Sequence, residues 1–263
     1  MRLKRADLHT HTTFSDGRGS LEAVVASAKE QSLEVLAITD HYDAHDFRPK
    51  IALLEAESLL EHFTAIRALS VPDDLILYCG LETTPLPNGL LDIEPEVLAV
   101  CDLIITSCHY IPFEGEIVPG EYFNDQYWAL YKEIMLLMAA GEGDIVGHCE
   151  DYLPIERFIE GLDTTYADRR EICRAIVDRY LDRAYVDAFA DRLLSSGKLC
   201  ELHCATETPR GWVIQRLADR GVRFTPGSDA HAVSHVGMTA WAYTVSNATG
   251  AVLCTTLEEI HDR

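Results

Sequence analysis

The sequence has few basic residues, no C-x-x-C pair of cysteines and no long apolar run. Its 22 Lys and Arg stand against 43 Asp and Glu, which gives a formal net charge of −21. A protein of this sign repels polyanions unless a metal ion or a local basic patch compensates, so nucleic acid is not expected as a main partner. Most carboxylates are expected to form a solvated acidic surface, although bound divalent cations would also offset part of the charge.

The scattered cysteines and the missing apolar runs bear on the cellular compartment. None of the eight cysteines forms a C-x-x-C pair, so we expect reduced thiols in the core rather than disulfides or a thiolate zinc site. No apolar run approaches the roughly 18 residues of a membrane span, and the N-terminus passes directly into polar residues. Neither export nor membrane insertion is indicated, and a cytoplasmic protein is expected, whereas the sequence leaves the oligomeric state open.

Short apolar or β-branched runs alternate with longer helical patterns. The predicted strands are 6–10, 35–39, 75–81, 103–107, 145–148, 199–205 and 223–226. The predicted helices are 20–31, 51–69, 126–140, several turns within 164–196, and 209–220, with Ser20 as an N-cap and Gly221 as a C-terminal stop. This alternation favours a parallel sheet, open or closed into a barrel. At 263 residues one domain, residues 1–263, is expected, because α/β barrels of about 250 residues routinely form a single unit.

Two segments depart from the simple alternation. Residues 150–197 are longer than a crossover requires and rich in Asp and Arg, so we interpret them as additional helices packed beside the sheet. After Gly237, residues 239–245 are interpreted as a further strand, followed by another at residues 251–255.

The first strand ends in Asp7-Leu-His9-Thr-His11. Because side chains alternate along a strand, Asp7, His9 and His11 project to the same side, where two imidazoles can bind one metal ion. A packed structural histidine is the alternative for either ring taken alone. The pair at the carboxyl end of a first strand favours a metal site.

Most of the later predicted strands also end in residues that bind metals. The second ends in Thr39-Asp40-His41, the fourth in Ser107-Cys-His109, the fifth in Gly147-His148, and the seventh in Gly227-Ser-Asp229-Ala-His231. Barrel enzymes assemble their sites from residues at the carboxyl ends of several strands, so the recurrence favours one shared centre. Asp40 could instead cap its loop, or orient a neighbouring histidine.

Two carboxylates extend this set. Gly80-Leu-Glu82 ends the third strand, and a glutamate there can bridge two ions with one oxygen on each. Asp16, in Phe14-Ser-Asp16-Gly17, follows the first strand and can reach the same centre from its loop. An ordinary Asp-Gly turn is the alternative interpretation of Asp16.

In this order the motifs Asp-Leu-His-Thr-His, Thr-Asp-His, Gly-Leu-Glu, Ser-Cys-His, Gly-His and Gly-Ser-Asp-Ala-His resemble those of the PHP family, named for polymerase and histidinol phosphatase. The resemblance spans Asp7 to His231, and the last motif is most similar to that of stand-alone histidinol phosphatases. It implies an α/β fold, a distorted (β/α)7 barrel of the PHP type with a helical insertion.

The resemblance also implies two to three divalent metal ions. The implied ligands are His9, His11, Glu82 and Asp229 for a first ion, Glu82, His109 and His148 for a second, and Asp16, His41 and His231 for a third. Zinc, manganese and iron all suit a mixed shell of imidazoles and carboxylates. Glu82 and Asp229 would thereby also be catalytic.

The sixth strand departs from the family pattern. It has Glu201-Leu-His203-Cys204-Ala-Thr206 where histidinol phosphatases typically have Glu-Ile-Asn-Thr-Ser-Gly. His203 is a candidate catalytic acid or substrate contact, with a packed histidine as the alternative. Outside the motifs, we interpret His62 and His261 as surface residues and His45 and His235 as candidate rim groups.

The resemblance implies a metal-dependent phosphoesterase that hydrolyses a small phosphomonoester, with L-histidinol phosphate as the first candidate. A phosphodiesterase or nucleotide phosphatase of the same family remains open, as does a metal-binding PHP module without turnover. A C–N hydrolase of the amidohydrolase type is less favoured, because such enzymes often need a carboxylated strand lysine. None of the five lysines ends an internal predicted strand.

An acidic protein must attract an anionic substrate locally, through metal ions and one or two arginines. Arg210 and Arg18 are candidates for binding phosphate, because guanidinium matches phosphate bidentately, although either could instead pair with an acidic residue. We expect Glu201, His203 and the acidic insertion after Glu150 to face the other, amine-bearing end of a small phosphorylated metabolite.

Overall fold

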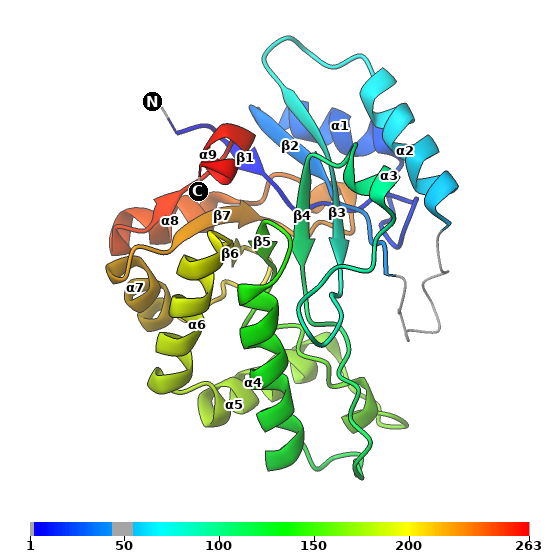
Figure 1. The fold of residues 1–263 in the computed structure, drawn as a ribbon. Coiled ribbons are helices and arrows are strands. Elements are labelled where there is room, and N and C mark those ends of the chain that lie inside the picture. Colours follow the sequence, from blue (N-terminus) through cyan, green and yellow to red (C-terminus); the bar gives the residue numbers. More distant parts are fainter. Residues whose placement is uncertain (1–2, 44–54, 263) are drawn as a thin grey trace.

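Eight parallel strands form one sheet within the described part of the chain. The computed structural model describes residues 3–43 and 55–262. The strands follow one another in chain order across the sheet (Figure 1). They are β1 (Ala6–Asp7), β2 (Val35–Ile38), β3 (Ile76–Thr83), β4 (Leu103–Thr106), β5 (Ile145–Val146), β6 (Leu199–His203), β7 (Arg223–Gly227) and β8 (Val252–Leu253). The seven predicted strands are therefore confirmed.

The sheet curls until its first and seventh strands meet. Leu8 N–H donates to the carbonyl of Pro226 at 3.0 Å, and a parallel bridge joins Thr10 to Ala230. The short β8 pairs with β7 at Arg223 and Phe224, nearer the start of that strand. The predicted distorted α/β barrel is thus confirmed, with β8 as a short additional strand.

Helices connect the successive strands. They are α1 (Leu21–Glu30), α2 (Ala56–Ala68), α3 (Pro95–Leu98), α4 (Asp125–Ala140), α5 (Tyr166–Tyr180), α6 (Arg183–Ser196), α7 (Gly211–Asp219), α8 (Ala240–Thr249) and α9 (Leu257–His261), with the 3-10 turns Glu156–Phe158 and Val233–His235. The Ser20 side chain accepts from Ala23 N–H and caps α1 as predicted. The predicted helix at 51–69 is described only from residue 55, and residues 51–54 lie outside the described residues.

The insertion at residues 150–197 forms α5 and α6 and packs on the barrel. Ile176 of α5 and Phe189 of α6 belong to the same hydrophobic cluster as Val146 of β5 and Cys200 of β6. Figure 1 shows α4 and α6 side by side, and the arrowheads of β3 and β4 point toward the half of the molecule that holds α4 and α5. The insertion therefore lies on the side of the strands' carboxyl ends.

The prediction of a strand at residues 239–245 is wrong. This segment begins α8, whose buried residues Ala242 and Ser246 are four positions apart, the spacing of a helix rather than a strand. Aromatic and β-branched residues, including Trp241, Tyr243 and Val245, suggested a strand. They are instead partly buried against the core. The strand expected at 251–255 is present as the two-residue β8.

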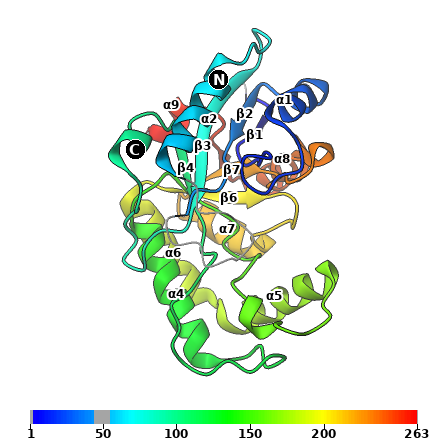
Figure 2. The same cartoon turned by 90° about the vertical axis from the view of Figure 1, so that its right-hand side faces the viewer.

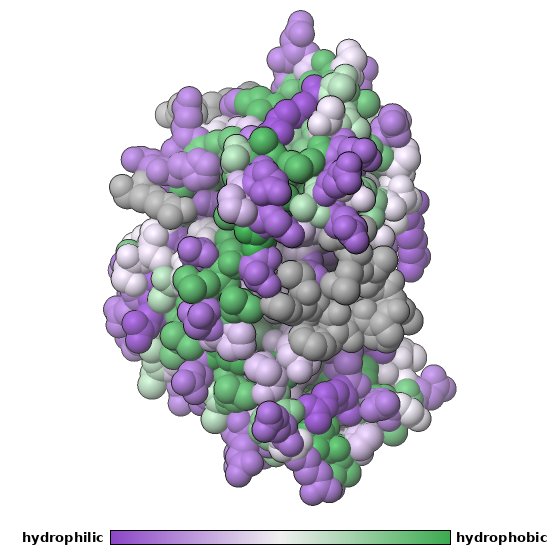
Figure 3. Space-filling view, turned by 45° about the vertical axis from the view of Figure 1, so that its right-hand side comes forward, coloured by the Kyte–Doolittle hydropathy of each residue, from purple (hydrophilic) through white to green (hydrophobic). Residues whose placement is uncertain are grey.

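The surface and the core divide as the composition suggests. Seven of the eight cysteines are buried and all eight are free. On the face shown in Figure 3, hydrophilic side chains are distributed over most of the surface, with hydrophobic residues between them. None of the described helices combines the length and the hydrophobicity that a membrane crossing requires.

Candidate metal centre

The structure brings all nine predicted metal ligands together at the carboxyl ends of the strands. Their imidazole and carboxylate atoms fall into groups in which all ligand atoms lie within 4.8 Å of one another. Three groups consist of these residues alone: His9, His11, Glu82 and Asp229; Glu82, His109 and His148; and His11, Asp16, His41 and His231. A fourth group joins His41 and His109 to Asp43. The first three groups reproduce the three predicted sets, with His11 added to the third. Their role as ligands stays a prediction.

Glu82 lies at the middle of the centre, and its two oxygens face different histidines. Oε2 lies 3.3 Å from His9 Nε2 and 3.1 Å from His41 Nδ1. Oε1 lies 2.9 Å from His148 Nε2 and 3.2 Å from His109 Nε2. The carboxylate is 1% exposed, and although burial opposes ionisation, the surrounding histidines hold its pKa well below the usual range. This is the geometry of a carboxylate that bridges two cations.

Several polar atoms of the centre are buried without a hydrogen-bond partner among the described residues. They are Nε2 of His9, both ring nitrogens of His11, Nδ1 of His41 and Oδ1 of Asp229. Buried polar atoms in native proteins almost always have a partner, and each unsatisfied one costs about 1–3 kcal/mol. These nitrogens and oxygens converge on one region, where several lie within ion-pair distance of a carboxylate but make no hydrogen bond, so the residues present fit divalent cations.

The third group is built around Asp16, on the loop after β1. Asp16 Oδ1 lies 3.1 Å from His231 Nε2, 3.5 Å from His41 Nε2 and 4.0 Å from His11 Nδ1. Burial opposes ionisation of Asp16, but the hydrogen bond to His231 and the nearby rings hold its pKa well below the usual range. Burial also opposes the charged form of His231, yet the Asp16 and Asp229 carboxylates raise the pKa of that ring to about 9.

A further carboxylate that the sequence reasoning missed lies behind His109. The Asp43 carboxylate accepts hydrogen bonds from Thr84 N–H and from the Thr83 hydroxyl, and it lies 3.7 Å from His109 Nδ1. Asp43 therefore faces the ring nitrogen of His109 opposite the one that faces Glu82. The sequence did contain a signal for Asp43, because it lies two positions after His41, the spacing that places side chains on the same face of an extended segment.

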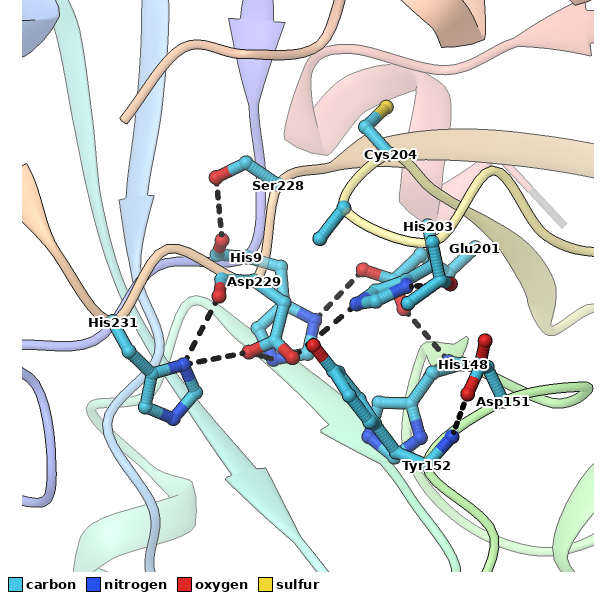
Figure 4. A network of polar contacts seen from close by, with 12 residues as sticks. His9, His148, Asp151, Tyr152, Glu201, His203, Cys204, Ser228, Asp229 and His231 are labelled. Carbon is cyan, nitrogen blue, oxygen red and sulfur yellow. Dashed lines mark hydrogen bonds and ion pairs between the residues drawn. The ribbon is translucent and has the colours of Figure 1, made fainter. Parts of the chain in front are cut away.

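Glu201 and His203 of β6 lie beneath the centre rather than facing a substrate. Glu201 Oε1 lies 2.7 Å from His9 Nδ1, and its Oε2 accepts from His148 N–H at 2.7 Å (Figure 4). His203 is fully buried, with Nε2 3.2 Å from Asp229 Oδ2 and Nδ1 2.5 Å from the Thr206 hydroxyl. Neither residue is among the described ones that line the cavity, so the structure does not support the expectation that both face the substrate, and His203 fits the alternative of a packed histidine beside Asp229.

Asp40 and His62 form a second pair of residues that supports the metal centre, after Glu201 and His203. The Asp40 carboxylate accepts from Thr12 N–H at 2.7 Å and from the Ser15 hydroxyl at 2.6 Å, and it lies 2.9 Å from His62 Nε2. Burial opposes ionisation of Asp40, but the bond to His62 and the other donors lower its pKa to about 2. The interpretation of His62 as a surface residue is wrong, because its side chain is 9% exposed and its ring stacks on Phe14 with centroids 4.0 Å apart.

Arg210 is held away from the centre by acidic partners. Its Nη2 donates to Glu150 Oε1 at 2.7 Å and to the Leu181 carbonyl at 2.7 Å, and its Nη1 donates to Asp178 Oδ1 at 2.9 Å. Arg210 is not among the described residues that line the cavity over the centre. This arrangement does not support the predicted contact with phosphate, and the pairing with acidic residues is the alternative that the sequence left open.

A cavity of about 1020 Å³ lies over the three groups. Arg18 and His235 line it, as the sequence suggested, whereas His45 lies outside the described residues. The insertion contributes Arg169, Arg170 and Arg174 to the wall as well as Asp151 and Glu156, so the described wall does not support the expectation that the insertion presents mainly carboxylates.

The fold and the site define a class of protein: an α/β barrel with a candidate multinuclear metal centre at the carboxyl ends of its strands. The chain belongs to the PHP domain family, whose model matches residues 7–189. Asp229 and His231 lie beyond the matched segment, so their place in the centre comes from the structure.

Two curated relatives are similar over about half of this chain. The DNA polymerase/3'-5' exonuclease PolX of Bacillus subtilis is 28% identical over 145 residues, which are 55% of this chain and 23% of the relative. The uncharacterized protein MJ1295 of Methanocaldococcus jannaschii is 33% identical over 139 residues, which are 52% of this chain and 58% of the relative. The matched part is therefore less than two thirds of either relative's length.

Two solved structures share the fold over nearly the whole chain. Histidinol phosphate phosphatase of Lactococcus lactis, solved with zinc, L-histidinol and phosphate, has a TM-score of 0.64 and 19% identity and covers 96% of both chains. A putative histidinol phosphatase of Listeria monocytogenes has a TM-score of 0.65 and 17% identity, covering 90% of this chain and 99% of its own. At these identities the likeness concerns the fold.

Proposed function

We propose that this protein is a metal-dependent phosphoesterase that hydrolyses a small phosphomonoester. The observation that carries the proposal is the position of Glu82, whose two oxygens face separate groups of histidines. Paired metal sites in phosphatases bind the attacking and the leaving oxygens on neighbouring ions, and a shared carboxylate sets the two ions side by side.

Three sets of residues would hold the ions. The sets are His9, His11, Glu82 and Asp229 for the first ion, Glu82, His109 and His148 for the second, and His11, Asp16, His41 and His231 for the third. When bound, divalent ions supply Lewis-acid stabilisation of the phosphoryl oxygens and lower the pKa of an attacking water. Zinc is the first ion to test because the Lactococcus lactis neighbour was solved with it, and manganese and iron suit the same ligands.

The residues around the ligands orient them and exclude water. Glu201 accepts a hydrogen bond from His9 Nδ1 and thereby leaves Nε2 free to face the centre. His203 likewise orients the Asp229 carboxylate, because its Nε2 lies within hydrogen-bond distance of Asp229 Oδ2. Arg18 lines the cavity on the exposed side, where its guanidinium can neutralise charge on a phosphoryl group.

The comparisons support phosphoester hydrolysis, and they leave two classes of substrate to distinguish, phosphomonoesters and phosphodiesters. The Lactococcus lactis neighbour bears the name of a phosphomonoesterase, whereas the Bacillus subtilis relative bears that of an exonuclease, which cleaves diesters. The chain's net charge of −21 favours a small monoester over a nucleic-acid strand. L-Histidinol phosphate is the first compound to test.

A phosphate-release screen tests the proposal. The purified protein would be loaded with zinc, manganese or iron(II) without oxygen, analysed for bound metal, and assayed on a panel of monoesters and diesters. We expect two to three ions per chain, and turnover of monoesters that stops when the metal is removed by chelation. Fewer than one ion per chain after loading, or cleavage of diesters alone, would overturn the proposal.

A further inference from the structure

One face of α5 forms the wall of the cavity opposite the metal centre. Tyr166, Arg169, Arg170, Cys173 and Arg174 all line the cavity. They follow Tyr166 at intervals of three, four, seven and eight positions, which place side chains on one face of a helix. Figure 2 shows α5 set apart from α4 and α6, on the lower right of the molecule.

Arg170 fixes this helix to the loops that leave β5 and β6. Its Nε lies 2.7 Å from Asp151 Oδ2, and its Nη2 donates to the Thr206 carbonyl at 2.6 Å. Asp151 is 2% exposed, so the pair is largely shielded from water and holds its geometry. Arg170 therefore has a structural role, and its positive charge is balanced by the Asp151 carboxylate.

Two tyrosines connect α5 to the floor of the centre. The hydroxyls of Tyr166 and Tyr152 lie 3.1 Å apart. The Tyr152 ring in turn packs edge-on against His203 and His148, with centroids 5.1 and 5.6 Å away. Figure 4 shows Tyr152 in front of His148, and Tyr152 also lines the cavity. The cavity face of α5 is thus held in a fixed position relative to the predicted metal ligands.

Arg169 and Arg174 are the arginines of the cavity face of α5 that remain available to bind an anionic group of a substrate. Both are exposed, and neither forms an ion pair with another described residue. Among the described residues, the carboxylates that line the cavity apart from the metal centre and Asp151 are Glu156 and Glu207. A chain with 43 acidic and 22 basic residues therefore places an arginine-rich face toward this cavity. Such a face attracts anions and disfavours a cationic group.

The cavity is large enough for a substrate that extends beyond its phosphoryl group. At about 1020 Å³ the cavity is at the upper end of the range for sites that bind whole metabolites, about 300–1,000 Å³. A phosphoryl group on the metal centre fills a small part of this volume. The rest of the substrate then lies toward α5.

We propose that the substrate is a phosphomonoester with a second anionic group, a carboxylate or another phosphate, that binds Arg169 and Arg174. The inference rests on the proposed function and narrows its substrate class. It also reverses the expectation that an amine-bearing end faces the insertion, because α5 contributes arginines and no carboxylate to the described cavity wall.

Binding of phosphonates tests the inference without turnover. Titration calorimetry on the metal-loaded protein would compare alkylphosphonates with ω-phosphonocarboxylates and alkane bisphosphonates of two to six methylenes. We expect binding about tenfold tighter when a second anion is present at the matching chain length, as for a charge-assisted contact partly screened by solvent. Aminoalkylphosphonates should bind no better than the alkylphosphonates. The carboxylate and bisphosphonate series then show which anion the wall prefers.

Matched variants test whether the tighter binding of compounds with a second anion depends on the arginines of α5. Arg169→Ala/Arg174→Ala should remove the advantage of the second anion and leave the affinity for alkylphosphonates within about twofold, as for surface changes outside a contact. Arg192→Ala, an exposed arginine of α6 outside the cavity, is the control. Equal affinities with and without the second anion in the wild type would overturn the inference, as would an advantage that survives the double variant.

The two proposals fail in different ways. A protein that binds its metals but releases phosphate from no monoester overturns the proposed function and, with it, this inference. A protein that hydrolyses monoesters but ignores the second anion retains the proposed function and loses the inference alone.

Discussion

Glu201 Oε1 lies 2.7 Å from Nδ1 of His9, and both side chains are buried. Burial lowers the pKa of His9, but the carboxylates of Glu201, Glu82 and Asp229 outweigh it and raise that pKa well above its ordinary value. The contact also decides which ring nitrogen points to the centre, because the nitrogen that faces the carboxylate keeps its proton and donates a hydrogen bond to it.

Glu201→Gln should therefore weaken metal binding without removing a ligand. The amide retains an acceptor but loses the charge that fixes the His9 tautomer, and we expect a loss of about 10–100-fold in metal affinity. Competition with a chromophoric chelator measures it. Glu207→Gln, at an exposed position beyond the end of β6, is the control and should bind metal as the wild type does. Unchanged affinity in Glu201→Gln would show that Glu201 does not orient His9.

His62→Ala tests the support beneath the loop that carries Asp16. Removing the imidazole leaves the buried Asp40 carboxylate without one of its partners, at a cost of about 1–3 kcal/mol in the free energy of unfolding. Because Asp40 also binds Thr12 and Ser15, we expect reduced occupancy of the third ion alone. Thermal unfolding and metal analysis measure the two effects.

His261→Ala is the matched control for this prediction, since that ring is 46% exposed on α9. A His62→Ala protein that keeps full metal content and wild-type stability would contradict the role of this support.

Glu82→Gln should remove more activity than Asp16→Asn. Glu82 faces histidines of all three groups, whereas Asp16 contacts only the third. We expect kcat/KM on a monoester to fall at least about 100-fold in Glu82→Gln, and less in Asp16→Asn. Both variants would be assayed after metal loading, with metal content measured on the same samples. Wild-type activity of Glu82→Gln at full occupancy would exclude the bridging role.

The third ion should bind more tightly as pH rises. The pKa of His231 in the metal-free protein is raised to about 9, so its ring is protonated at neutral pH and must lose that proton to bind a cation. Between pH 7 and pH 9 the apparent affinity should increase about tenfold per unit and then level off. Competition titrations at several pH values measure the slope. His231→Gln should abolish it, and a slope that persists in this variant would point to another group.

The parallel arrangement of the strands and the position of the predicted ligands at one edge could be derived from the sequence, whereas the division of the ligands into three sets was implied by the family resemblance. A ligand type stands at the end of nearly every predicted strand, and parallel strands bring their carboxyl ends to one edge. The alternation of side chains along a strand likewise predicted that His9 and His11 project to the same side. These features are local or follow from the general architecture, so they do not depend on detailed packing.

The orientation of the supporting residues could not be derived in this way. Glu201 and His203 lie on a strand whose two faces are both buried, and periodicity does not tell which face meets the substrate. Arg210 is committed to Glu150, which is 60 positions away in the sequence. The contact of His62 with Asp40 likewise joins a helix to a strand end, so its partner becomes visible only when α2 is placed.

The closure of the sheet between β1 and β7 sets a condition on biosynthesis. His9 and His11 are translated early, but two of the three groups lack a member until Asp229 and His231 have left the ribosome. A nascent chain that ends before β7 lacks Asp229 and His231, so among the described groups it contains in full only Glu82, His109 and His148, and His41, Asp43 and His109. Occupancy of all the proposed sites would then report that β1 and β7 have met.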